Sequence, residues 1–138
     1  MTNVIMLSIH HIHAERIFKG EKTLEIRKTA PRGAPFIVYM YETKSGGGAG
    51  AVVGQFNCKA VIKTDAFSGW SEEPYLKETR ELIIKKSCLS FSELVEYAKG
   101  GDICALIVSE VTRYPTPLPL SHAVADVLER RRHRLPER

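Results

Sequence analysis

The hydrophobic and polar positions of the first 28 residues predict a strand, a helix and a second strand. Residues 3–9 form a short apolar run that contains β-branched side chains, which is typical of a buried strand. Apolar residues recur at helical spacing over residues 11–19, and Gly20 can adopt the left-handed backbone conformation that ends a helix. Residues 23–28 alternate between apolar and polar side chains, so we expect a half-buried strand there.

The rest of the chain predicts a hairpin followed by helices and a further strand. Residues 36–41 and 52–63 are expected to pair as a hairpin through the glycine-rich loop 45–50. This loop lacks the Gly-Lys-Ser/Thr order and the following helix of a phosphate-binding Walker loop, so we interpret it as a mobile connection. The next predicted element is a helix over 72–86, whose start Pro74 confines to about that point, and a helix with a capping box at Ser90 and Glu93 follows it. A strand is expected over 104–112, and an extended segment, whose prolines suit a sheet edge or a closing segment, over 114–119. The last predicted helix is capped by Ser121 and frays in its arginine-rich end.

These elements predict an α+β domain with a curved sheet. The chain has 138 residues, which fits one domain of ordinary size. About five strands and three or four helices are expected, and because they do not alternate regularly, a doubly wound parallel fold is disfavoured. We therefore expect a small barrel-like sheet of mixed, mostly antiparallel strands with helices at its flanks.

Composition and charge narrow the functional classes. No stretch of 18 apolar residues occurs and the N-terminus lacks a basic segment, so we expect no membrane span or signal peptide, and a cytoplasmic location. Of the net charge of +4, the last ten residues carry +3 through five Arg and two Glu, which leaves +1 for the other 128. The basic pI therefore describes a tail rather than a binding face. The three cysteines lie far apart and predict neither a zinc knuckle nor a disulfide framework.

The segment 20–27 contains the strongest candidate for a functional site. Glu25 and Arg27 lie two residues apart on a predicted strand and so share a face, and Lys22 lies at the turn before it. A carboxylate can accept a hydrogen bond from an exocyclic amino group such as that of cytosine, while Lys and Arg can hold a phosphate. The alternative is a solvated strand face with an ordinary Glu–Arg ion pair, which contributes less than about 1 kcal/mol.

Histidines and aromatic residues give weaker candidates. His10 and His13 can share a helix face, but we interpret them as partly solvated residues at a helix start, with no metal ligands assigned and no cofactor predicted. The sequence leaves open whether the protein binds a divalent metal ion. Tyr39 and Tyr41 share one face of a strand and can stack on a base, the alternative being core packing with satisfied hydroxyl groups. Trp70 is a further candidate for stacking, in a loop.

A family resemblance adds to these observations. The run Leu7-Ser8-Ile9, a helix, and then Gly20-x-Lys22-Thr23-x-Glu25-x-Arg27 resembles the start of an ASCH (activating-signal-cointegrator homology) domain, a family of the PUA-like superfamily. The hairpin around 36–41 and 53–56, the helix ending at 97–100 with the strand that follows it, and the segment 114–120 resemble later parts of this domain. The resemblance covers roughly residues 4–121, so residues 1–121 are assigned to the domain and 122–138 to a basic C-terminal helix or tail.

The resemblance implies a small PUA-like barrel with a cleft beside the first helix, in which Lys22, Glu25 and Arg27 meet a ligand. Ser8 and His10 come directly before the first helix, near the cleft that the resemblance implies, and are expected to contact the ligand. PUA-like domains are generally associated with RNA or modified bases. We therefore expect a binding module for RNA or a nucleotide-like small molecule, in which Glu25 and Arg27 recognise the ligand and Lys22 supplies positive charge.

Two alternatives stay open. Some relatives are hydrolases: one branch hydrolyses N4-acetylcytidine with a Lys-x-x-Thr arrangement, and another is reported to cleave RNA. In this chain Glu25 takes the threonine's place, so Lys22 and Glu25 are catalytic candidates only if the carboxylate acts as a general base toward water. The second alternative is a protein-interaction domain that works through the arginine-rich terminal helix.

Overall fold

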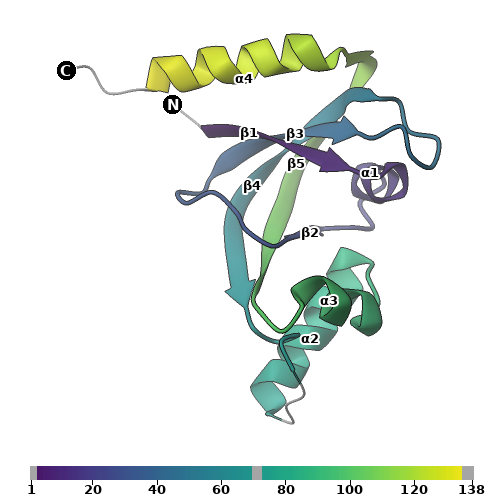
Figure 1. Cartoon of the computed structure of the whole chain (residues 1–138), viewed down its shortest axis with the longest axis vertical. Helices are drawn as coiled ribbons and strands as arrows, with labels where there is room; N and C mark the ends of the chain where they lie inside the picture. The colour runs from purple at the N-terminus through teal and green to yellow at the C-terminus, as the bar shows by residue number, and fades with distance from the viewer. Residues whose placement is uncertain (1–2, 70–72, 135–138) are drawn as a thin grey trace.

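The computed structural model describes residues 3–69 and 73–134, which contain five strands and four helices (Figure 1). In chain order the elements are β1 (Asn3–Ile9), α1 (His11–Phe18), β2 (Leu24–Arg27), β3 (Phe36–Glu42), β4 (Ala51–Thr64), α2 (Pro74–Ser87), α3 (Phe91–Ala98), β5 (Ile103–Leu118) and α4 (Leu120–Arg134). None of the described helices is long and apolar enough to cross a membrane.

The strands form one curled sheet in the order β1-β3-β4-β5-β2. β1 pairs with β3 in parallel, and the other three pairings are antiparallel. This confirms the predicted α+β fold with a mixed, mostly antiparallel sheet, which takes the form of a half-barrel. Because β1 and β2 are the two edges, the N-terminal strand and the strand after α1 lie at opposite ends of the hydrogen-bonded ladder.

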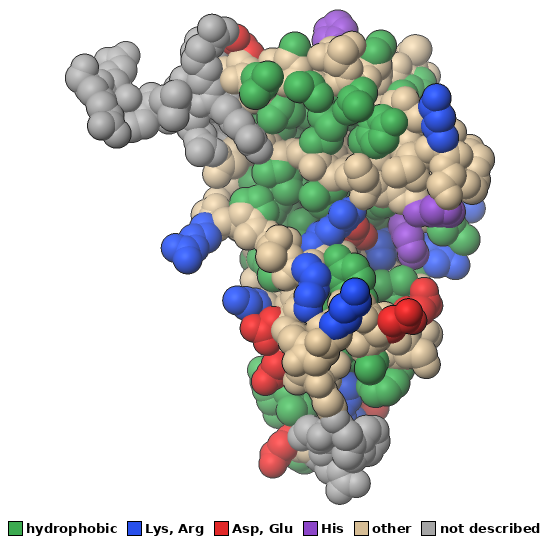
Figure 2. Space-filling view, viewed as in Figure 1, with side chains coloured by type: hydrophobic (Ala, Val, Ile, Leu, Met, Phe, Trp, Pro, Cys, Tyr) green, Lys and Arg blue, Asp and Glu red, His purple; other side chains and the backbone are tan. Residues whose placement is uncertain are grey.

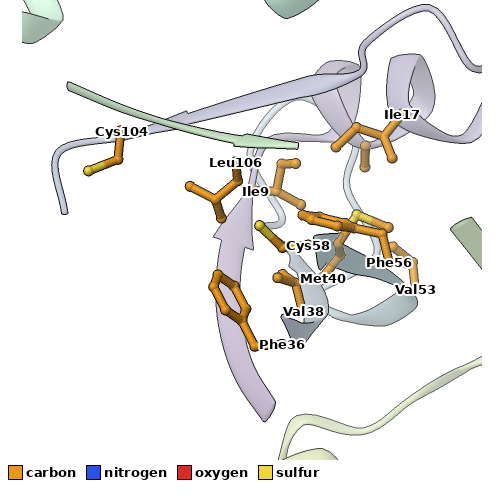
Figure 3. Close-up of a cluster of buried hydrophobic side chains, with 11 residues drawn as sticks. Ile9, Ile17, Phe36, Val38, Met40, Val53, Phe56, Cys58, Cys104 and Leu106 are labelled. Carbon is orange, nitrogen blue, oxygen red and sulfur yellow. The ribbon is translucent and has the colours of Figure 1, made fainter. Parts of the chain in front are cut away.

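The helices cover different parts of the sheet (Figure 1). α1 contributes Ile17 to the main core cluster, which also contains Phe36 and Met40 of β3 and Phe56 of β4 (Figure 3). A second cluster joins α2 and α3 to β2 and β5. α4 packs across the other face of the sheet, and its buried Ala123 and Val127 form a third cluster with residues of β1, β3 and β4. Burying each large apolar side chain stabilises the fold by about 1.5–3 kcal/mol.

Several local predictions are confirmed. Gly20 has a φ of +79° and follows the end of α1, as a helix terminator does. Pro74 is the first residue of α2, where its missing N–H costs nothing. The capping box is present, because the Ser90 side chain accepts from the Glu93 N–H and the Glu93 carboxylate accepts from the Ser90 N–H.

Other predictions are wrong in extent. β5 does not end near residue 112 but continues to Leu118, because beyond residue 107 it pairs with β4 on one side only and tolerates Pro115 and Pro117 there. α4 does not fray at Arg130 but extends to Arg134. The sequence pattern predicts that Cys58, Ala60 and Ile62 share one face of β4, but a register shift after Cys58 turns Ile62 to solvent.

Candidate binding site

The turn after α1 directs Lys22 into the protein. The N–H groups of Glu21 and Lys22 both donate to the carbonyl of Arg16, at 2.9 and 3.0 Å, and Gly20 supplies the left-handed conformation between them and the helix. These two bonds satisfy the carbonyl of Arg16 in the last turn of α1 and reverse the chain. Lys22 therefore enters the space between α1 and α2, and β2 begins two residues later.

Lys22 is a buried cation, only 1% exposed. Its Nζ donates to the carbonyl of Ser87 at 2.5 Å and lies 3.6 Å from Oε1 of Glu25. Ser87 is the last residue of α2, and the negative end of a helix dipole favours a positive charge there. Burial lowers the pKa of Lys22 from its ordinary value, and the neighbouring Glu25 carboxylate opposes this shift.

Glu25 lies at the centre of a chain of polar contacts. It is 5% exposed, and its Oε2 accepts from Nε of Arg27 at 3.0 Å. Nη2 of Arg27 in turn donates to the carbonyl of Ser8 on the opposite edge strand. The burial of Glu25 contradicts the alternative of a solvated strand face. A buried carboxylate requires such partners, because an unpaired buried charge costs several kcal/mol.

These groups line a pocket of about 250 Å³. Its wall is formed by Ser8, Ile9, His10, His13, Lys22, Glu25, Ile26, Arg27, Leu89, Glu93 and Tyr97. Five of the residues proposed from the sequence therefore meet here: Ser8, His10, Lys22, Glu25 and Arg27. The contribution of α3 was not foreseen, and Tyr97, which is 39% exposed, gives the pocket an aromatic side chain. No local sequence signal points Tyr97 toward β2, because only the packing of α3 brings them together.

The two histidines of the pocket differ in their surroundings. His10 caps the N-terminus of α1, where its ring nitrogen accepts from the N–H of Ile12 at 3.3 Å. The Nδ1 atom of His13 is shielded from solvent and has no hydrogen-bond partner in the described part of the chain. Burial, followed by the charge of Lys22, lowers the pKa of His13 below its ordinary value, so its imidazole is neutral at pH 7.

Tyr39 and Tyr41 do not line the pocket. Tyr39 is buried in the cluster beneath α4, where its hydroxyl donates to the Asp126 carboxylate, and Tyr41 packs against the same cluster. Burial raises the pKa of Tyr39 to about 12. For Tyr39 the structure thus matches the alternative of core packing with a satisfied hydroxyl group. Trp70 lies outside the described residues.

A second hollow, of about 540 Å³, is formed by residues that follow Arg27 along the chain together with residues of β4 and β5. Lys28, Arg32 and Lys63 lie in its wall together with the 29–34 segment. Nζ of Lys28 donates to the carbonyls of Ala98 and Asp102, which fixes its ammonium group. Figure 2 shows Lys and Arg side chains gathered across the middle of this face of the molecule, where Figure 1 shows β2.

Comparison with solved structures identifies the fold class. The crystal structure of ASCH from Zymomonas mobilis is similar with a TM-score of 0.68 and 19% sequence identity, over 97% of this chain and 82% of that chain. A mutant of the same protein gives a TM-score of 0.68 at 18% identity, over 97% and 84%. The hypothetical protein PH0355 gives 0.51 at 17% identity, over 79% and 98%. The half-barrel is therefore a PUA-like fold.

The sequence itself shows the family. The ASCH domain pattern matches residues 7–118, which is most of the chain, whereas no curated protein gives a significant match. The protein belongs to the ASCH domain family.

Proposed function

We propose that this ASCH domain binds RNA or a nucleotide-like ligand and receives a base in the pocket around Glu25. The observation that carries the proposal is the buried Glu25 carboxylate, held between the ammonium group of Lys22 and the guanidinium group of Arg27. Ionised carboxylates only accept hydrogen bonds, and an exocyclic amino group such as that of cytosine is a matching donor. A site that fixes its acceptor in this way discriminates against ligands that lack the donor.

The size and lining of the pocket support a ligand of base or nucleoside size. Pockets for drug-sized ligands commonly measure about 300–1,000 Å³, and this one holds about 250 Å³. Tyr97 contributes a partly exposed ring on one side, and Ile26 and Leu89 contribute apolar surface. Aromatic rings stack on any base, while the polar groups select among them.

The basic second hollow favours a nucleic-acid strand as the ligand over a free base. Lys28 follows Arg27 directly in the sequence, so one chain segment contributes side chains to both hollows. Phosphate groups on either side of a bound base would meet Lys28, Arg32 and Lys63. Lys63 lies 3.8 Å from the Asp102 carboxylate and is 69% exposed, so it can exchange this partner for a phosphate.

The burial of Lys22 changes the role proposed for it. Its ammonium group contacts the Ser87 carbonyl and Glu25 rather than open solvent. We therefore assign Lys22 to positioning the Glu25 carboxylate, and the attraction of phosphate to the exposed cations around residues 28–63. A buried cation that is paired in this way contributes little to the release of counterions that makes nucleic-acid binding depend on salt.

The test is binding of free nucleosides and of fluorescein-labelled single-stranded RNA, measured by calorimetry and fluorescence anisotropy. Glu25→Gln should weaken binding of cytosine-containing ligands at least about tenfold, because one buried polar contact to a base contributes about 1–3 kcal/mol. Glu96→Gln, which makes the same charge change on an exposed position of α3, is the matched control. Equal affinity of the Glu25→Gln variant and the unaltered protein would contradict the proposal.

A second candidate function, hydrolysis of an acylated nucleoside or of RNA, is favoured by one observation. His13 lines the same pocket and its pKa is lowered, so a neutral imidazole is available there to accept a proton from water. The buried Lys22 beside Glu25 is then placed to stabilise developing negative charge.

Turnover assays separate this candidate from binding alone. N4-acylated cytidines and labelled RNA are incubated with the protein, with and without a divalent metal ion. Hydrolysis that is lost in His13→Gln and in Glu25→Gln, but not in Glu96→Gln, would support catalysis at this site. Ligand binding without any turnover would contradict hydrolysis and support the binding function only.

A further inference from the structure

Three potential metal ligands meet outside the pocket, where β3 ends beside the first turns of α1. His11 and Glu15 lie one helical turn apart on α1, and Glu42 is the last residue of β3. Nδ1 of His11 lies 3.0 Å from Oε1 of Glu42, and one ligand atom from each of the three residues lies within 4.8 Å of the other two. None of the three lines the pocket around Glu25.

The close contact between the imidazole of His11 and the carboxylate of Glu42 is not an ordinary hydrogen bond. Its Nδ1 is shielded from solvent, yet it makes no well-aligned hydrogen bond within the described ranges, although the carboxylate oxygen is only 3.0 Å away. In a direct hydrogen bond the N–H points at the acceptor. Two ligands of one ion point instead at the ion, and with ion–ligand distances of about 2.0–2.2 Å their atoms lie about 3.3–3.6 Å apart in a tetrahedral site, a few tenths of an ångström more than the 3.0 Å here.

The charges in this cluster also favour a cation. Glu42 is 4% exposed, and its carboxylate accepts from the N–H of Ala49 at 2.9 Å in addition to its contact with His11. Glu15 brings a second carboxylate, whose Oε2 pairs with Nη2 of Arg113 at 2.9 Å. Two carboxylates beside one imidazole repel each other, and Arg113, which attracts both, supplies one positive charge against their two negative charges. A divalent ion would satisfy both.

We propose that His11, Glu15 and Glu42 bind one divalent first-row transition-metal ion, with Zn²⁺ as the reference ion. One nitrogen and two carboxylate oxygens form a borderline ligand set, which suits Zn²⁺ better than the all-oxygen preference of Mg²⁺ or Ca²⁺. Three protein ligands leave a fourth position for water. The side chain of His11 is 38% exposed, so the ion can enter from solvent.

The proposed ion would also fix the glycine-rich loop. Glu42 holds this loop through the Ala49 N–H bond, and its carbonyl accepts from the N–H of Gly50. A side chain at Gly46, which has a φ of +69°, would overlap the imidazole of His10 at the mouth of the pocket. Binding at Glu42 would therefore reduce motion of residues 43–50 beside the pocket.

The first test is calorimetric titration of the full chain with zinc chloride. One ion per chain is expected, with affinity weakened at least about tenfold in His11→Asn, Glu15→Gln and Glu42→Gln. His122→Asn, on the exposed surface of α4, is the matched control and should bind as the unaltered protein does. Arg113→Met should bind zinc more tightly, because it releases the Glu15 carboxylate and removes a positive charge. If Glu42→Gln does not fold, His11→Asn and Glu15→Gln decide the question.

The second test measures the mobility of the glycine-rich loop instead of the binding of the ion. Amide hydrogen exchange over residues 43–50 should slow at least about threefold when zinc is added, and this protection should be absent in Glu15→Gln. Three results would overturn the proposal. They are no saturable zinc binding, unchanged zinc binding in both His11→Asn and Glu15→Gln, or loss of zinc binding in Cys88→Ser, which replaces the half-buried free thiol directly after α2, with retention in His11→Asn. Each of these results would mean that zinc binds at another site or does not bind at all.

Discussion

Arg27 donates a hydrogen bond to the carbonyl of Ser8 and thereby joins the two edge strands of the sheet, which no backbone ladder connects. The same guanidinium group holds Glu25 through its Nε atom. One planar side chain thus spans the opening of the half-barrel at the position of the pocket. This use of two donors in fixed directions is specific to arginine.

Replacing Arg27 with lysine therefore tests geometry without changing charge. Arg27→Lys should weaken binding of a cytosine-containing RNA about tenfold, because a lysine cannot contact Ser8 and Glu25 together. The free energy of unfolding should change by less than about 1 kcal/mol, since the side chain is partly exposed. Anisotropy titrations and urea unfolding give the two values. Affinity equal to that of the unaltered protein would show that the bridge has no part in recognition.

Lys22 and Glu25 should be energetically coupled. Lys22→Met and Glu25→Gln should each lower the free energy of unfolding by about 3 kcal/mol, because each leaves a buried polar group with fewer partners. The double variant should lose about 2 kcal/mol less than the sum of the two, as expected for residues in one network. Denaturant unfolding of the four proteins measures this. Additive losses would mean that the 3.6 Å contact contributes no net stability.

The pH dependence of stability should carry a contribution from His13. Because its pKa is lower in the folded chain than the ordinary 6.5, the unfolded chain takes up the proton first as the pH falls below that value. The free energy of unfolding should therefore decrease below pH 6.5, by at most about 1.4 kcal/mol per pH unit from this one group. His13→Gln should remove this part of the slope and His122→Gln should not. Identical slopes in the unaltered protein and His13→Gln would contradict the assignment.

Two tyrosines should separate ligand binding from stability. Tyr97→Ala should weaken RNA binding about fivefold or more, since stacking of one base contributes about 1–3 kcal/mol, while Tyr75→Ala, at a 71% exposed position of α2, should have no effect. Tyr39→Phe should leave binding unchanged and lower the free energy of unfolding by about 1–2 kcal/mol, through loss of the bond to Asp126. Weaker binding in Tyr39→Phe would show that Tyr39 takes part in ligand binding.

Local sequence signals predicted the elements whose causes are local. Three helix boundaries show this: the capping box at Ser90, the proline that begins α2 and the glycine that ends α1. Each of these features acts within one turn of the chain, so the residues that set the boundary lie next to it in the sequence. The prolines of β5 indicated an extended segment over 114–119, but local signals did not show that this segment continues the strand. Its prolines are tolerated only because the strand beside them is absent, which is a property of sheet order.

The sequence by itself determined that Lys22, Glu25 and Arg27 would lie close together, because a turn and a period of two fix their spacing along one short segment. Only the tertiary structure decided that Lys22 and Glu25 are buried, since the partner of the ammonium group is the end of α2, 65 residues away. It also brought Tyr97 to the pocket and Glu42 to His11, while it placed Tyr39 under α4. Contacts between distant segments depend on how the elements pack, and one strand's pattern does not contain that information.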